Sequence, residues 1–395
     1  MKNPSEDGHV ARRFAPTALM LGNIVTGCSV LAPAGMLSEL SSGLEVTIRD
    51  AGLLITFGAI MLCIGSPLTA WLTSRIERRT LLTATLAVLA LTNAASALAP
   101  DYATLLIIRL IMLAVGALYT PQAAGTAALI VRPEKRGSTI AYIFLGWSLA
   151  AAVGLPLITF IASRYGWRAV YGSIGVIGCV SFLLLAWRLP RGLVGTPVDL
   201  KTWADVGRNR MIVLLLSITT LQMSGQFVVF TFMGPLLTKL TDAGPDAIGL
   251  VFALYGVFGF IGIAIATRIV DSWGAYKTSL LFMVLMQAGV TGWAFSAGIY
   301  PLMACSVAIW GLGFASTNSM QQVRLVVAAP NLASASVSLN TSVLYIGQAV
   351  GSAVGGMMYA RDLLYGAGYV AMCFTALALI MVVLTKPPRV RVAAG

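Results

Sequence analysis

Long apolar segments, separated by short polar breaks, make up most of this 395-residue chain. A segment of about 18 or more apolar residues is long enough to cross a bilayer as a helix. Within lipid, a helix satisfies its own backbone hydrogen bonds, so it is the natural spanning structure. With 58% hydrophobic and only 10% charged residues, the chain is predicted to be an all-α integral membrane protein.

About twelve segments reach the spanning length. We expect transmembrane helices over residues 15–38, 51–72, 80–99, 103–130, 138–161, 168–187, 211–238, 247–267, 278–298, 301–323, 334–358 and 366–385. The first of them follows a polar tail and has no small-residue cleavage site behind it, so we expect a retained helix and not a signal peptide. Because no sizeable soluble region remains, this organisation favours a solute carrier.

The basic residues predict an orientation. The net charge is +12, and 20 of the 26 lysines and arginines fall in segments that share one side of the membrane with the N-terminus. Segments rich in Lys and Arg stay in the cytoplasm, so we expect both termini there, in an inner membrane of bacterial type. The charge is thus explained without a nucleic acid partner. We expect the lipid bilayer, a small-molecule substrate and protons as partners, and a monomeric protein.

The sequence predicts no cofactor and no metal site. Each of the five cysteines lies in a different apolar segment, and the single histidine, His9, lies in the polar tail. Disulfide frameworks and metal sites need these residues at characteristic spacings. The chain also has no Walker-type phosphate loop, so an ATP-driven pump is not expected.

An internal repeat divides the chain into two halves. Residues 189–210 form the longest break on the cytoplasmic side, rich in glycine, proline and charge, with six predicted spans on either side. At a constant offset, Gly52, Leu53 and Gly65 of the second span correspond to Gly249, Leu250 and Gly262 of the eighth. We therefore expect two pseudo-symmetric six-helix bundles, residues 15–188 and 211–385, joined by a cytoplasmic linker at 189–210 and flanked by tails at 1–14 and 386–395.

Three motifs occur in the first half. Residues 67–82 read PLTAWLTSRIERRTLL and contain the basic cluster Arg75, Arg78 and Arg79. The fourth span carries Arg109 within LIIRLIMLAVGALYTPQAAG, and residues 146–157 of the fifth read GWSLAAAVGLPL. With these motifs on these helices, nearly the whole chain resembles the major facilitator superfamily, and within it the drug:proton antiporter branch that includes bacterial drug, arabinose and nucleoside exporters.

The resemblance implies a charge lock between the halves at the basic loop, which holds one conformation and breaks in the other. The chain departs from the family pattern because Ser74 stands where an aspartate is usual, and Glu77 where a glycine is usual. We expect Glu77 and Asp271 to supply the carboxylates that Ser74 cannot. The gating loop is therefore predicted to comprise Arg75, Glu77, Arg78, Arg79 and Asp271. The simpler explanation of the basic residues is that they fix the topology.

Small residues and a proline in the fifth span predict close helix packing and a bend. Gly146, Gly154 and Pro156 lie in one helix, where small residues let backbones approach and proline bends the span. The resemblance implies that this bend limits leakage between the two sides. Gly347 and Gly351 begin a similar stripe in the eleventh span. Ordinary packing is the alternative for both stripes.

Arg109 is the most informative single side chain. It lies about six residues into its span, roughly 9 Å along the helix, where a charge needs a partner or a watery cavity. No Asp or Glu lies mid-span, and Ser29 and Val30 stand where family members carry an acid in the first span. We expect Arg109 to face the cavity, and an unpaired arginine there would favour an anionic or electron-rich solute. The alternative is that it snorkels to the interface.

Two further expectations follow for the site. Without a mid-span acid, proton coupling would use a carboxylate at the rim, Glu39 or Asp50, provided that burial shifts its pKa. The cavity would be mainly apolar with a few directed polar groups. Its predicted lining is Arg109, Asn23, Thr26, Tyr119, Trp147, Gln222, Gln226, Trp310, Asn318, Asn340 and Tyr345. For each amide the alternative is a purely structural hydrogen bond between helices.

The resemblance and the residues together predict a secondary active exporter of a small organic compound, drug-like or a metabolite, which works by alternating access and proton antiport. An alternative is a facilitator or a proton-linked importer of an organic anion or sugar. Two other classes are a membrane sensor that does not transport and an integral membrane enzyme. The pseudo-symmetric halves argue against the sensor, and the lack of a mid-span carboxylate pair argues against the enzyme.

Overall fold

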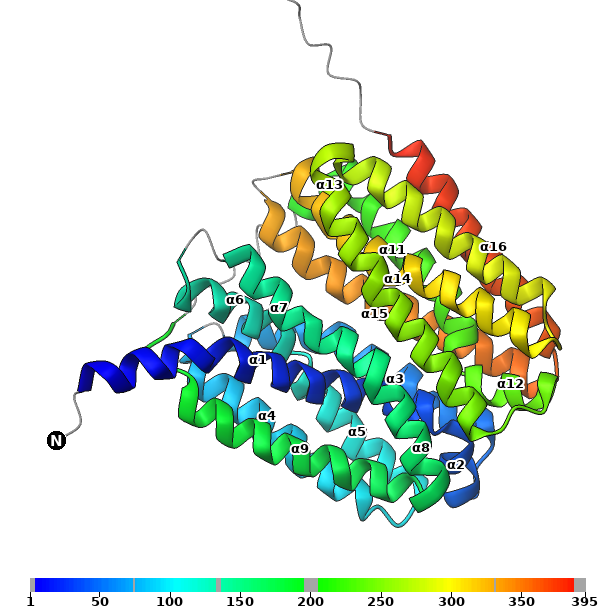
Figure 1. The fold of residues 1–395 in the computed structure, drawn as a ribbon, viewed down its shortest axis with the longest axis horizontal. Coiled ribbons are helices and arrows are strands. Elements are labelled where there is room, and N and C mark those ends of the chain that lie inside the picture. Colours follow the sequence, from blue (N-terminus) through cyan, green and yellow to red (C-terminus); the bar gives the residue numbers. More distant parts are fainter. Residues whose placement is uncertain (1–3, 74, 133–135, 195–204, 330–331, 387–395) are drawn as a thin grey trace, which may run out of the picture.

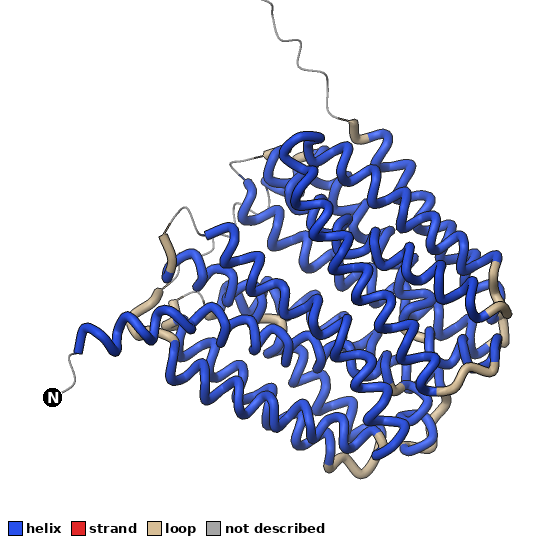
Figure 2. Tube along the Cα trace, viewed as in Figure 1, coloured by secondary structure: helices blue, strands red, loops and turns tan. Residues whose placement is uncertain are grey.

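The computed structural model describes residues 4–73, 75–132, 136–194, 205–329 and 332–386. Within these ranges the chain is helical with no strand (Figure 2). Twelve segments of helix are long and apolar enough to cross a membrane, from Phe14–Gly35 to Leu364–Leu384. The predicted class, an all-α membrane protein with about twelve spans, is confirmed. Asp271 falls in a described helix, but its side chain, like all of Ser74, lies outside what the structure describes.

Helices of the first half pack around α1. They are α1 (Pro4–Gly35), the short α2 (Leu37–Gly43), α3 (Ile48–Leu72), α4 (Arg78–Ala97), α5 (Tyr102–Gly116), α6 (Tyr119–Ile130), α7 (Arg136–Leu149), the π-helical segment η2 (Ala150–Gly154), α8 (Leu155–Tyr165) and α9 (Trp167–Arg188). The second half consists of α11 (Arg210–Phe230), α12 (Met233–Thr241), α13 (Pro245–Phe295), α14 (Tyr300–Ala328), α15 (Ala333–Ala360) and α16 (Leu364–Leu384).

Prolines explain where the spans depart from regular helices. Proline has no N–H, so the carbonyl four residues before it loses its helical partner. The fourth predicted span, 103–130, is interrupted between α5 and α6 at Ala117, four residues before Pro121. The seventh, 211–238, ends at Phe230, and α12 starts again after Thr231, which lies four residues before Pro235.

Two more irregularities have local causes. The segment η2 ends just before Pro156, and the N–H of Leu155 bonds to the carbonyl of Ala150, one residue further back than in an α-helix. The predicted break between the eighth and ninth spans, residues 268–277, contains no loop. The chain instead turns within α13 at Gly274, whose φ of 78° is a conformation that favours glycine.

The two halves touch at one end of the molecule (Figure 1). Helix α3 of the first half packs against α15 of the second, and η2 and α8 pack against α13. These contacts lie toward the end that carries α2 and α12, which we call the distal end. Toward the opposite end, which carries the start of α1 and the end of α16 and which we call the terminal end, the ribbons of the halves diverge (Figure 1). Away from this contact, polar side chains are grouped separately within each half.

Candidate functional site

Arg109 is buried inside the first half, where it joins α5 to α1 and α9. Its Nη1 donates to the backbone carbonyl of Ser29 at 3.1 Å and to the hydroxyl of Tyr171 at 3.3 Å. Its Nη2 donates to the carbonyl of Val30 at 3.4 Å, and only about 1% of the residue is exposed. The guanidinium therefore does not snorkel to an interface.

The position of Pro33 explains why this carbonyl is available. The Ser29 carbonyl lies four residues before Pro33, which cannot donate the usual helical hydrogen bond. Arg109 supplies the missing donor. The side chain of Ser29 is also engaged, since its Oγ accepts from Asn93 Nδ2 at 2.9 Å. Where family members carry an acid, the first half thus has a guanidinium held by backbone carbonyls and a tyrosine hydroxyl, at a site created by a proline.

A second network in the first half joins α1, α6 and α7. Thr120 Oγ1 donates to Asn23 Oδ1 at 2.8 Å and accepts from Trp147 Nε1 at 3.0 Å, while Asn23 Nδ2 donates to the Ile143 carbonyl at 3.0 Å. Of the other predicted lining residues in this half, Tyr119 and Thr26 are buried and donate to carbonyls within α1. Among the five predicted lining residues of the first half, Trp147 is the one that is partly exposed.

The predicted amides of the second half lie together in a row along α11. Gln222 Nε2 donates to Asn318 Oδ1 on α14 at 2.5 Å. Gln226 Oε1 accepts from Trp310 Nε1 at 3.0 Å and from the hydroxyl of Tyr255 at 3.1 Å. One turn earlier on the helix, Thr219 donates to Asn340 on α15 at 2.7 Å. Thr219, Gln222 and Gln226 share one face of α11, because residues three, four and seven positions apart lie on the same side of a helix. The spacing of the two glutamines predicted this shared face.

Eight of the eleven predicted lining residues are buried, and three are partly exposed. The three are Trp147, Asn318 and Tyr345. Tyr345 on α15 packs in a cluster with residues of the first half, among them Trp147, Leu113 and Met61. The structure therefore packs Trp147 and Tyr345, from different halves, against the same buried cluster, whereas Arg109 and the amides lie within their own halves. That these residues bind a solute stays a prediction.

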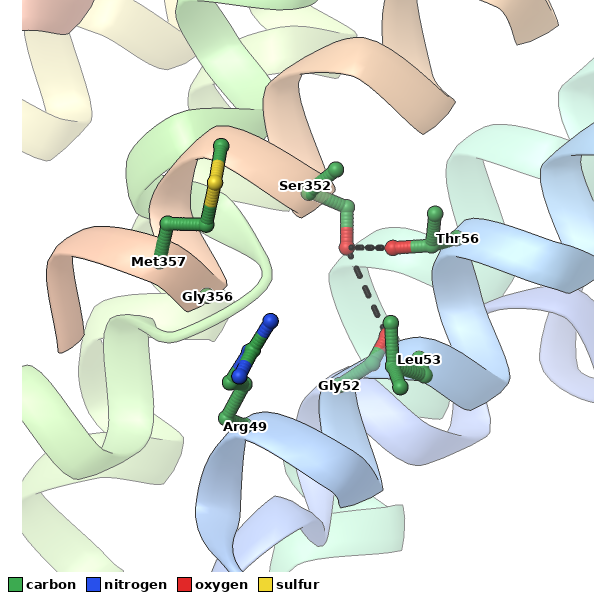
Figure 3. Close-up of a pocket in the computed structure, with 8 residues that line it drawn as sticks. Arg49, Gly52, Leu53, Thr56, Ser352, Gly356 and Met357 are labelled. Carbon is green, nitrogen blue, oxygen red and sulfur yellow. Dashed lines mark hydrogen bonds between the residues drawn. The ribbon is translucent and has the colours of Figure 1, made fainter. Parts of the chain in front are cut away.

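The distal contact between the halves includes two hydrogen bonds from hydroxyl groups. Thr56 Oγ1 on α3 donates to Ser352 Oγ on α15 at 3.0 Å, and Ser352 Oγ donates to the Gly52 carbonyl at 3.5 Å (Figure 3). These residues line a pocket of about 120 Å³ between α3 and α15. The stem of Arg49 also approaches Gly356 of α15 at this pocket. We did not predict this contact, because isolated Ser and Thr residues are common in spans and gave no signal.

Glycines permit close packing at several of the predicted positions. A Cβ at Gly146 would lie 2.5 Å from the carbonyl oxygen of Met20, and one at Gly154 would lie 2.7 Å from Cys28 Sγ. Gly347 and Gly351 of α15 pack directly on the α11 backbone at Thr220 and Ser224. Between the halves, Gly256 of α13 packs on the backbone of η2. Sequence reasoning missed Gly256, although it lies in the second copy of the repeat.

The loop predicted as a gate makes its described contacts with the first half and with the start of the linker. Glu77 accepts from the Gly192 N–H at 2.6 Å and from Thr80 at 2.9 Å. The hydrogen bond from Gly192, followed by that from Thr80, lowers the pKa of Glu77 below 4.5. Arg79 donates to the Ala186 carbonyl, Arg78 is buried and Arg75 is exposed. Among the described side chains the one ion pair joins Lys239 and Asp362 of the second half.

The two coupling candidates differ in their surroundings. Glu39 lies on α2 at the distal end, and partial burial raises its pKa above the ordinary value of 4.5, outweighing its backbone hydrogen bond. Asp50 is held in the first turn of α3, where its Oδ2 accepts from the hydroxyl of Thr47 at 2.7 Å. Burial therefore perturbs the acid on α2 in the direction that proton uptake near neutral pH requires.

Comparisons with known proteins agree with this architecture. The sequence profile of the Major Facilitator Superfamily matches residues 19–352 and, in a second match, residues 215–394. The inner membrane transport protein YdhP of Escherichia coli K12 is 29% identical over 353 residues, which cover 88% of this chain and 89% of YdhP. A chloramphenicol efflux pump of Mycobacterium tuberculosis H37Rv is 26% identical, with 89% of this chain and 85% of the pump covered.

Two further comparisons extend the range of relatives. A probable sugar efflux transporter of Mannheimia succiniciproducens is 23% identical, over 94% of this chain and 93% of that protein. The crystal structure of a D-xylose–proton symporter superposes with a TM-score of 0.77 at 17% identity, over 95% of this chain and 98% of the symporter. The structural likeness concerns the fold.

Proposed function

Because this chain belongs to the Major Facilitator Superfamily, and is thus a membrane transporter, we propose that it exports a small organic solute by secondary active transport. The observation that carries the proposal is the asymmetric contact between the halves. They touch at the distal end through α3 with α15 and η2 with α13, and diverge toward the terminal end (Figure 1). Breaking this contact while closing the other end would expose a central site to each side in turn.

The direction of transport is proposed from the charges and the relatives. Basic residues concentrate at the terminal end, which by the positive-inside rule supports a cytoplasmic location for this end. The conformation described here would then be open to the cytoplasm, where an exporter takes up its solute. Two of the relatives carry efflux in their names, one for chloramphenicol and one for sugar.

We propose proton antiport as the driving force, with Glu39 as the coupling carboxylate. One charge that crosses about 100 mV releases about 2.3 kcal/mol, enough for a solute gradient of nearly two decades. The raised pKa of Glu39 and its place at the distal end support this choice. The absence of an acid mid-span in the sequence favours a second candidate, an uncoupled facilitator. An anionic solute has less support, because both terminal nitrogens of Arg109 already donate to groups of α1 and α9.

Inside-out vesicles that contain the overexpressed protein test the proposal. The vesicles are energised to build a proton gradient, and neutral, cationic and anionic compounds are added in turn while a pH-sensitive dye is followed. We expect proton release on addition of one class, and none in vesicles that lack the protein. If labelled solute equilibrates without any proton release, antiport is wrong and the facilitator replaces it.

A further inference from the structure

Hydrogen-bonding groups in the interior of the second half are predominantly amides and hydroxyls. The described buried cation in this half, Arg324, donates to the carbonyl and hydroxyl of Thr385 at the end of α16. Asp and Glu residues of the second half lie at the ends of the spans or between them. In the first half, Arg109 is held by α1. A solute that reaches the polar row along α11 therefore meets amides and hydroxyls.

Gln222 and Asn318 form a pair that leaves one donor and one acceptor in neighbouring positions. Gln222 Nε2 donates to Asn318 Oδ1 at 2.5 Å, which joins the two amides head to tail. Gln222 Oε1 is buried and has no hydrogen-bond partner among the described residues. Asn318 Nδ2 has a weak contact, 3.8 Å to the sulfur of Met223. A buried amide oxygen without a partner costs about 1–3 kcal/mol, so the arrangement needs a reason.

Gln226, one turn further along α11, shows what a purely structural amide looks like in the same row. Its Oε1 accepts two hydrogen bonds, from Tyr255 at 3.1 Å and from Trp310 at 3.0 Å. Aromatic rings enclose it, with Tyr255 and Trp310 in edge contact at 5.5 Å between centroids. The acceptor of Gln226 is thus saturated, whereas the acceptor of Gln222 is not.

The pair lies beside a partly exposed stretch of α14. Asn318 is half-buried, and Phe314, one helical turn before it on the same face, is half-buried as well. The ring of Phe314 is held against Tyr255 at 5.3 Å between centroids. Asn340 Nδ2, on the neighbouring α15, is a further buried donor without a partner among the described residues.

We propose that the Gln222–Asn318 pair binds a hydroxyl or amide group of an uncharged solute. A hydroxyl can donate to Gln222 Oε1 and accept from Asn318 Nδ2 at once, and an amide can do the same through its two ends. An ammonium group would find no carboxylate in this interior, and a carboxylate would be repelled by the Gln222 oxygen. The inference rests on the proposed transport function and names the chemical class of its solute.

Three sugars of the same frame test the inference. Glucose is neutral, glucosamine carries an ammonium group, and glucuronate carries a carboxylate. The full-length protein is reconstituted in liposomes for counterflow of each labelled sugar, and its thermal stabilisation by each sugar is measured in detergent. We expect glucose to exchange and stabilise, with the two charged sugars at least about tenfold weaker, which corresponds to one good hydrogen bond.

Variants of the pair separate recognition from folding. Gln222→Glu places a carboxylate in the pair, and we expect it to weaken glucose about tenfold and to raise the relative affinity for glucosamine. Asn318→Ala should also weaken glucose, but it should lower the thermal stability as well, because Gln222 Nε2 loses its acceptor. Gln287→Glu is the matched control, because Gln287 donates to Thr291 and the Met372 carbonyl on the α16 side of α13, and we expect the preference for glucose to persist.

Three results of these assays would overturn the inference. Preference of the wild-type protein for glucosamine or glucuronate overturns the inference and leaves transport standing. Failure of all three sugars to exchange or stabilise also overturns it, while the vesicle assay decides the transport function separately. Unchanged selectivity in a stably folded Gln222→Glu protein removes the pair from recognition.

Discussion

Gly256→Ala should separate the two halves at the distal end. Gly256 of α13 packs on η2 of the other half, and an added Cβ would lie 2.7 Å from the carbonyl carbon of Ala151 and closer still to the backbone of Ala152. Ordinary contacts begin near 3.4 Å, so the backbones would have to move apart by about 0.7 Å or more. Both neighbours are backbone atoms, so no side chain can rotate away.

The magnitude follows from the cost of overpacking, about 1–3 kcal/mol. The clash exists only while the halves touch, so the whole cost falls on the conformation with a closed distal end. The balance between distal-closed and distal-open proteins should shift by about 5- to 150-fold toward the open one. The change lies entirely in the conformational equilibrium, and we expect each half to keep its own fold.

Cysteine labelling measures this shift. Leu53, which lines the distal pocket, is changed to cysteine in a protein whose five native cysteines are replaced by alanine. The rate of labelling by a membrane-impermeant maleimide applied from the distal side reports opening, and Gly256→Ala should raise it. An unchanged rate in a stably folded variant would show that the contact of Gly256 with η2 does not keep the distal end closed.

Two glycines of the same helix are matched controls. A Cβ at Gly259 would lie 3.5 Å from the carbonyl oxygen of Gly311, an ordinary contact, so Gly259→Ala should leave the labelling rate unchanged. A Cβ at Gly262 would lie 2.9 Å from the carbonyl carbon of Leu312 in the same half. Gly262→Ala should therefore lower thermal stability without opening the distal end. If it raises the labelling rate as Gly256→Ala does, the effect is not specific to the contact between halves.

Three further perturbations follow from individual contacts. Arg109→Ala should lower the free energy of unfolding by about 1–3 kcal/mol, because the Ser29 carbonyl loses its donor. The loss should be smaller in a Pro33→Ala background, where the N–H of residue 33 can donate to that carbonyl. Denaturant titration of the wild type, the two single variants and the double variant measures this difference. Because the pKa of Glu39 is raised in the folded protein, its contribution to stability is present below pH 4.5 and is lost as the pH rises through the raised pKa. Glu39→Gln should therefore raise the Tm at pH 7 and leave it unchanged at pH 4, which scanning fluorimetry would measure. Ser352→Ala removes both hydroxyl hydrogen bonds between the halves and should speed labelling of the cysteine at position 53 by about 2- to 10-fold; an unaltered rate would mean that the two bonds do not hold the contact.

The sequence was sufficient for the spans and their number, because the membrane imposes a length and an apolar composition that can be read directly. It was also sufficient for the shared face of Gln222 and Gln226, which depends only on helical spacing. The interruptions at Ala117 and Thr231 were missed, although Pro121 and Pro235 lie four residues beyond them. A proline inside an apolar run frees the carbonyl four residues before it, but the helix can continue, as α1 does through Pro33.

The surroundings of Arg109 could not be predicted by searching for a carboxylate. Its partners are the carbonyl that Pro33 leaves free, a second carbonyl and the hydroxyl of Tyr171. Backbone partners and contacts between distant helices depend on tertiary packing, which a single sequence does not display. The same reason hid the Thr56–Ser352 contact, whose residues are 296 positions apart.

A reversible crosslink across the distal contact tests the central claim, which is that transport requires this contact to open. The hydroxyl oxygens of Thr56 and Ser352 lie 3.0 Å apart, so cysteines at both positions, in the protein without native cysteines, can be oxidised to a disulfide. Solute-dependent proton release is measured in one preparation of inside-out vesicles before oxidation, after oxidation and after reduction. We expect release to stop in the crosslinked protein and to return when the disulfide is reduced. Undiminished release from fully crosslinked protein would contradict this claim.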